Sequence, residues 1–91
     1  MQSGNYRVFA GEEPQELIEV TVVGPMVNIS GPIWNGRGRI ESGNYVGEFH
    51  DVVGDGAGRH FCQRIHNGVF DAYVLFDGAH RGMQLQWRLE P

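Results

Sequence analysis

HFCQRIHNGVFDAYVLF, the stretch from His60 to Phe76, decides the fold. Asn67-Gly68 separates two runs of alternating character, and this dipeptide is typical of a two-residue hairpin turn of type I′, in which both central residues have positive φ. The register that this turn sets places His66 opposite Val69. One face of the hairpin then collects an apolar set with a single polar member: Phe61, Gln63, Ile65, Phe70, Ala72, Val74 and Phe76. Because the turn chemistry and the hydrophobic pattern agree, we expect this set to face the core.

A second hairpin is predicted at Gly24-Pro25. Glycine accepts the positive φ of the first central position of a type II′ turn, and the negative φ of the second position suits proline. The turn aligns two apolar runs and predicts three cross-strand pairs: Val22 with Val27, Val20 with Ile29, and Glu19 with Ser30.

A third hairpin is predicted within GRGRIESGNYVGEFHDVVGDGAGRH, from Gly36 to His60, with Gly43-Asn44 as its turn. One face of this hairpin carries apolar residues and glycines, and the other pairs Arg39 with Glu48. We expect the glycines of the first face to make room for large neighbouring side chains. A phosphate-binding loop is disfavoured, because the segment has no G-K-[ST] motif and the chain has no lysine.

Two further strands complete the pattern. In MQLQWRLE, from Met83 to Glu90, apolar and polar residues alternate, as they do in a strand with one buried face. YRVFA, from Tyr6 to Ala10, is a shorter strand. Glu12 to Leu17 is the one helical candidate, with a loop as the alternative. We therefore predict a single all-β domain over residues 1–91, a small antiparallel meander of seven to eight short strands that forms a closed or partly open barrel. The alternative is a two-sheet sandwich.

The composition limits the partners and the compartment. The formal net charge is −4 and no basic stripe is present, so binding to nucleic acid is disfavoured. No apolar run approaches the roughly 20 residues that span a bilayer, and no secretory signal is visible. We expect a cytoplasmic protein without a membrane partner, although a secreted chain from which a signal has been removed would look the same.

The polar face of the His60–Phe76 hairpin holds the main candidate site residues. The predicted register places six of them together on this face: His60, Cys62, Arg64, His66, Asp71 and Tyr73. A His-x-Cys pair with a further histidine is compatible with a zinc site or with a Cys–His nucleophile. The alternative, which we favour, is a solvated outer face with an Arg64–Asp71 ion pair.

Other candidates are scattered along the chain. Trp34 precedes a turn signal, so it either lines a ligand pocket at a barrel mouth or plugs the end of the core. His50, Asp51 and His80 are suited to acid–base chemistry, but nothing in the sequence brings them together. No metal or cofactor motif is present, so we expect no cofactor.

The sequence therefore favours a non-catalytic binding or interaction module. Homodimerisation through a sheet edge or the outer face, and binding of a small molecule, are the expected modes of interaction. One alternative is a small enzyme or metal-binding protein that uses the face of His60, Cys62 and His66. Another is a lipocalin-like carrier of a small molecule.

Overall fold

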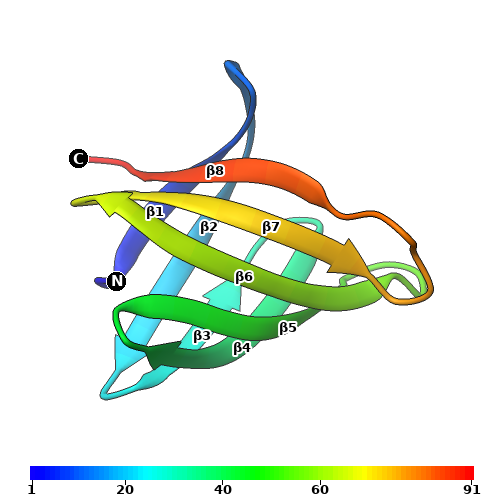
Figure 1. The fold of residues 1–91 in the computed structure, drawn as a ribbon, viewed down its shortest axis with the longest axis horizontal. Helices are drawn as coiled ribbons and strands as arrows, with labels where there is room; N and C mark the ends of the chain where they lie inside the picture. Colours follow the sequence, from blue (N-terminus) through cyan, green and yellow to red (C-terminus); the bar gives the residue numbers. More distant parts are fainter.

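The computed structural model of residues 1–91 is an all-β chain whose eight antiparallel strands close into a barrel (Figure 1). Each strand pairs with the next one in the sequence, and β8 pairs back with β1. The predicted all-β meander is confirmed, and the barrel is closed, so the sandwich alternative is wrong. The strands are β1 (Gly4–Ala10), β2 (Glu13–Val23), β3 (Met26–Ser30), β4 (Trp34–Glu41), β5 (Asn44–Asp51), β6 (Ala57–His66), β7 (Val69–Phe76) and β8 (Met83–Leu89).

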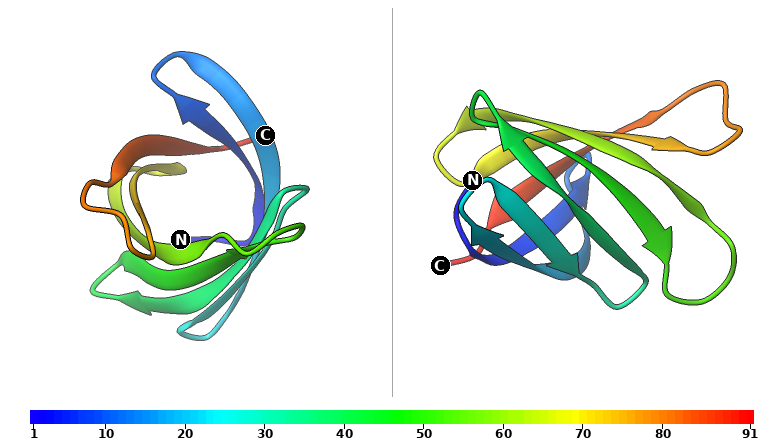
Figure 2. Two further views of the ribbon diagram at one scale, coloured as in Figure 1. Left: turned by 90° about the vertical axis from the view of Figure 1, so that its right-hand side faces the viewer. Right: turned by 90° about the horizontal axis from the view of Figure 1, so that it is seen from below.

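The two ends of the barrel differ. The loops β1–β2, β3–β4, β5–β6 and β7–β8 surround one end, which we call the mouth, and Figure 2 (left) looks along the ring of strands from that side. The turns β2–β3, β4–β5 and β6–β7 surround the other end. There the N-terminal segment packs against the barrel, because Met1 contacts the hydrophobic core and the hydroxyl of Tyr6 donates to the carbonyl of Gln2 at 2.8 Å. The mouth is therefore the end at which a ligand can enter.

Large aromatic side chains fill the interior. Trp87, Tyr6, Tyr45 and Phe70 are all essentially inaccessible to solvent. An eight-stranded barrel has an interior just wide enough to be filled by side chains, so large residues on some strands require small ones on their neighbours. Four inward positions of β4, β5 and β6 are accordingly glycine: Gly36, Gly38, Gly47 and Gly58.

Gly38 and Gly47 are directly paired across β4 and β5. A Cβ on Gly38 would collide with the carbonyl oxygen of Val46, and a Cβ on Gly47 would collide with the phenol ring of Tyr45. The Tyr45 ring thus lies over the bare backbone, in the manner of an aromatic side chain that covers a strand glycine. The glycine-rich stretch makes room for the aromatic core, as predicted.

The predicted hairpins differ in how well they match the structure. The pairing around Gly24-Pro25 is confirmed residue for residue. The β4–β5 turn instead lies at Ser42-Gly43, whose φ angles of 52° and 81° are both positive, as a type I′ turn requires. The resulting register differs from the predicted one by two residues, so Arg37 faces Glu48. Since side chains alternate with a period of two, this shift leaves the predicted faces unchanged.

The prediction for the face of β6 is wrong. His66 does face Val69, but a β-bulge at Ile65 moves every earlier pair by one residue, so Arg64 faces Phe70 and Gln63 faces Asp71. A one-residue shift exchanges the two faces of a strand. Phe61 is therefore 40% exposed on the outside, and the inward positions of β6 are Gly58, His60 and Cys62.

Interior volume explains this reversal. Gly58 lies opposite Phe49, and a Cβ there would meet the carbonyl oxygen of Leu75 as well as the Phe49 ring, so β6 turns a residue without a side chain inward at this point. His60 and Cys62 share the phase of Gly58 and fit beside the bulky side chains of the other strands. The type I′ turn expected at Asn67-Gly68 does not form either, because only Gly68 has a positive φ.

The Glu12–Leu17 segment is a strand and not a helix. β2 begins at Glu13, and its inward residues Ile18 and Val20 are buried against the core. Pairing with β1 stabilises this extended segment more than its local helical signal does, and the later part of β2, from Glu19, pairs with β3. The chain contains no helix that is long and apolar enough to cross a membrane.

We expect Gly38→Ala to destabilise the protein by about 2 kcal/mol or more relative to Gly36→Ala, because the new methyl group meets backbone atoms that cannot move independently. At Gly36 the nearest atom to a Cβ lies at 3.1 Å, so the same change on the same strand is a matched control. Urea unfolding of the two variants measures the difference. Equal unfolding midpoints would show that the β4–β5 contact is looser than described.

Candidate functional site

A cavity of about 300 Å³ opens at the mouth of the barrel. Ten of its 14 lining residues are hydrophobic, which is the usual character of a small-molecule site. Four of these residues are aromatic: Trp34, Phe49, Phe76 and Trp87. The polar lining residues are Gln15, Glu16, Asp51 and His60.

The mouth ends of β2, β4 and β5 bring two carboxylates and one indole ring to this cavity. Trp34 begins β4 and pairs with Asp51, the last residue of β5. The indole Nε1 of Trp34 donates to Oε2 of Glu16 at 2.6 Å. Glu16 lies in phase with the buried Ile18 of the same strand, so it also points inward. Trp34 thus has one carboxylate, from β2, as its hydrogen-bond acceptor, and its cross-strand partner on β5 carries a second.

His60 is the buried polar residue of the cavity wall, with only 3% of its surface exposed. Its ring centroid lies 4.7 Å from that of Trp34, 4.4 Å from that of Phe49 and 5.2 Å from that of Trp87. Burial among these rings lowers the pKa of His60 to about 4, because the charged form loses its hydration. The imidazole is therefore neutral near pH 7.

Two buried polar atoms of the cavity residues have no hydrogen-bond partner. They are Nδ1 of His60 and Nε1 of Trp87. An unsatisfied buried polar atom costs roughly 1–3 kcal/mol, and native structures contain few of them. Both atoms are closed off from solvent, so they are unsatisfied polar groups of the core that lie behind the cavity surface.

The sequence-predicted site residues separate into two groups. Trp34 lines the cavity and is 7% exposed, which agrees with its predicted place at a barrel mouth. His60 also lines the cavity, and Cys62 is buried in the core. The expectation that His60 and Cys62 lie on the outer face is wrong, because the bulge at Ile65 turns them inward.

The other predicted site residues lie outside the barrel. Arg64 is exposed and donates to Oδ1 of Asn67 at 3.2 Å, so the expected ion pair with Asp71 does not form. Asp71 instead accepts from Nε2 of Gln86 at 3.5 Å. His66 is exposed at the end of β6, and Tyr73 is 45% exposed, with its hydroxyl accepting from the amide of Gly82 at 3.1 Å.

The structure does not assemble the predicted metal or nucleophile site. No three His, Cys, Asp or Glu side chains are close enough together to hold a metal ion, so His60, Cys62 and His66 do not form one. Burial raises the pKa of the Cys62 thiol, whereas a nucleophilic cysteine needs a lowered one. His50 and His80 are exposed, and of the acid–base candidates only Asp51 reaches the cavity.

The sequence analysis did not predict that Glu16 and Asp51 line this cavity. The signal was available in the alternation of each strand. Asp51 continues the inward series of Tyr45, Gly47 and Phe49, and Glu16 begins the inward series of Ile18, Val20 and Val22. A carboxylate in phase with core residues, at the end of a strand, points into the mouth of a barrel.

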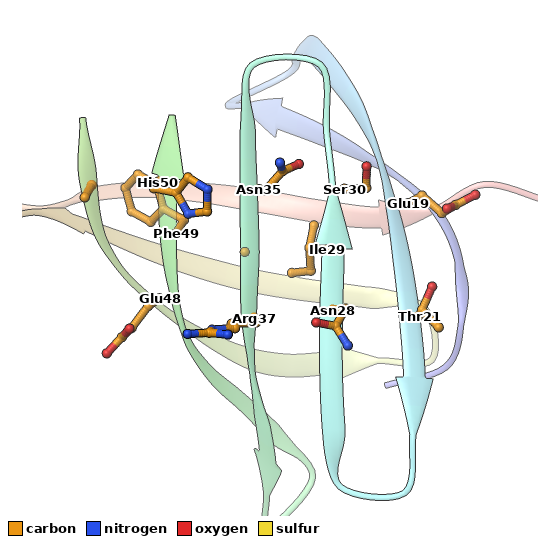
Figure 3. Close-up of a pocket in the computed structure, with 12 residues that line it drawn as sticks. Glu19, Thr21, Asn28, Ile29, Ser30, Asn35, Arg37, Glu48, Phe49 and His50 are labelled. Atoms are coloured by element: carbon orange, nitrogen blue, oxygen red, sulfur yellow. The ribbon is translucent and has the colours of Figure 1, made fainter. Parts of the chain in front are cut away.

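A second concave region lies on the outside of β2–β5 and measures about 580 Å³ (Figure 3). Its polar side chains stand in two rows, with Ile29 and Phe49 between them in Figure 3. This trough is larger than the mouth cavity, but it holds no buried unsatisfied atom and no buried titratable group. We therefore place the candidate site at the mouth. The two rows of the trough are Glu19, Ser30, Asn35 and His50, and Thr21, Asn28, Arg37 and Glu48.

Comparison with known proteins gives no match to a family model, a curated protein or a solved structure. The class to which the chain belongs is therefore defined by its own geometry. It is a closed eight-stranded meander barrel with an aromatic cavity at one end.

The buried His60 predicts a loss of stability in acid. The pKa is about 4 in the folded protein and 6.5 in the unfolded chain, so the unfolded state binds a proton that the folded state does not as pH falls through 6.5. We expect unfolding free energy to fall by about 3 kcal/mol between pH 7 and pH 4 through this group alone. Urea unfolding at both values measures the loss.

His60→Leu should remove this part of the pH dependence, whereas His66→Gln, a change at an exposed histidine, should keep it. If His60→Leu showed the same slope of stability against pH as the unchanged protein, the imidazole would not be buried in its neutral form.

Proposed function

We propose that this protein is a non-catalytic binding module that holds a small, largely apolar molecule in the cavity at the barrel mouth. The observation that carries this proposal is the cavity itself, a mostly apolar and aromatic pocket at the barrel mouth with Glu16, Asp51 and His60 in its wall. Ligand sites combine apolar walls with a few polar groups that fix orientation, and this cavity has that composition.

The size of the cavity supports a small ligand. At roughly 30 Å³ for each water-sized group, 300 Å³ holds a molecule of about ten non-hydrogen atoms. A single aromatic ring with a short polar substituent matches this volume. The proposal thus resembles the carrier alternative, with a smaller cavity than a carrier of long lipid chains would need.

Binding has more support than catalysis at this site. The enzyme alternative needs His60, Cys62 and His66 on one face, whereas His66 lies outside the barrel and the other two lie inside. The raised pKa of Cys62 also keeps its thiol protonated and unreactive.

We expect single-ring aromatic probes of about ten non-hydrogen atoms to bind one-to-one in this cavity, measured by calorimetry with neutral, cationic and anionic members of the set. Leu85→Trp fills the cavity with a larger side chain and should abolish binding of every probe. Leu75→Trp on the outer face of β7 is the matched control and should bind normally. If no probe bound saturably to the unchanged protein or to the Leu75→Trp control, the proposed function would be refuted.

A second candidate is homodimerisation through the outer face. Val46, Phe61 and Tyr73 are cross-strand neighbours on β5, β6 and β7, and the last two are 40% and 45% exposed. The expected route through a sheet edge has less support, because β1 and β8 pair with each other and close the sheet.

If the outer face mediates a dimer, Phe61→Ser should shift the mass measured by light scattering from twice the chain mass to that of one chain, since it removes the central apolar contact. Ile65→Ser, which changes another exposed residue of β6, is the control. A monomer at high concentration in the unchanged protein removes this candidate.

A further inference from the structure

We infer that the ligand of the mouth cavity is an organic cation, an ammonium group carried on an aromatic or other apolar body. This inference rests on the proposed function and names its ligand class. It follows from two features of the same wall, namely its charge and its aromatic side chains.

The charge of the wall is negative and uncompensated. Glu16 and Asp51 line the cavity, and no arginine does. Neither carboxylate takes part in an ion pair, because the ion pairs of the protein use other groups: Arg7 with Glu90, Arg39 with Glu41, and Arg88 with Glu12. A ligand that brings a positive charge supplies the partner that the fold does not, whereas an anion meets only repulsion.

Aromatic rings provide the second contribution. The faces of tryptophan rings attract cations more strongly than those of other aromatic side chains. Trp34 lines the cavity and keeps a little exposed surface, whereas Trp87 stacks against it with ring centroids 5.8 Å apart and is itself fully buried. The hydrogen bond from Trp34 to Glu16 holds one of these rings directly beside a carboxylate. A cation at this position contacts an aromatic ring and is close to the opposite charge at once.

His60 lies in the same wall and does not oppose a cation. Its Nδ1 is unpartnered but closed off from solvent, so it offers no direct contact to a molecule in the cavity. The lowered pKa of His60 keeps the imidazole neutral, so it adds no positive charge that would repel the ligand.

A bare metal ion fits the wall less well than an organic cation. Metal sites in proteins use three or more protein ligands, and no such group of side chains occurs in this structure. The remaining wall is apolar, so it offers contact to a hydrocarbon body and no coordination to an ion. The cation must therefore bring its own apolar part.

Three probes of nearly equal size and shape test the ligand class: 2-phenylethylammonium, 2-phenylethanol and phenylacetate. We expect calorimetry at low salt to show the ammonium binding about tenfold or more tightly than the alcohol, with phenylacetate weakest. Raising the ionic strength should weaken binding of the ammonium and leave binding of the alcohol unchanged.

Two variants locate the effect. Glu16→Gln and Asp51→Asn should each lower the affinity for the ammonium about tenfold and leave that for the alcohol within about twofold. Glu48→Gln, a change at an exposed carboxylate on the outer face of β5, is the matched control and should alter neither affinity. Because the alcohol reports on an intact cavity, a variant that fails to fold loses both probes and is recognised.

Each outcome has one meaning. Alcohol binding as tight as ammonium binding, or tighter binding of phenylacetate, overturns the inference and leaves the proposed function standing. Unchanged ammonium affinity in both carboxylate variants also overturns it. Absence of binding by all three probes refutes the proposed function itself.

Discussion

The limited interior volume of an eight-stranded barrel is the constraint on which this structure depends. Tryptophan, tyrosine and phenylalanine side chains from several strands meet in a space that can just be filled by side chains. They fit because β4, β5 and β6 present glycine at the inward positions between them, as at the Gly38–Gly47 pair. Tyr45 then covers the backbone at Gly47, two residues along the same strand, so the missing side chain of the glycine is offset by a large one next to it.

The same constraint places a histidine in the core. β6 turns Gly58 inward opposite Phe49, and the strand geometry then carries His60 and Cys62 inward with it. The bulge at Ile65 lets the hairpin end in its ordinary pairing of His66 with Val69. Burial of His60 costs stability in acid, and it leaves a polar nitrogen without a partner among aromatic rings.

The parts of the fold that are set by local turns could be predicted from the sequence. Every pair predicted around Gly24-Pro25 is present in the structure. The register predicted for β4 and β5 is wrong by two residues, and because this is an even number the predicted inward and outward faces are still correct. The face of β6 could not be predicted from alternation, since Phe61 and Ile65 are more apolar than the residues that lie inside. That choice depends on packing against Phe49 from another hairpin, and such non-local contacts leave no mark in a single run of sequence. Trp34 was identified at the mouth by its turn context, whereas the positions of Glu16 and Asp51 become evident only when the phase of each strand is known.

The mouth is the part of the barrel where residue choice departs from what folding alone favours. Inward positions near the other end, such as Val22 and Ile40, are apolar, whereas those at the mouth include Glu16, Asp51 and a buried imidazole. A carboxylate at such a position adds no apolar contact to the core, and its desolvation is unfavourable unless a partner is supplied. Of the two carboxylates only Glu16 has such a partner within the fold, and this partner, the indole N–H of Trp34, carries no charge. Proteins keep such local conflicts mainly where they serve a site. Glu16 and Asp51, which take part in no ion pair, therefore give the mouth the arrangement of a surface built to receive a positive group.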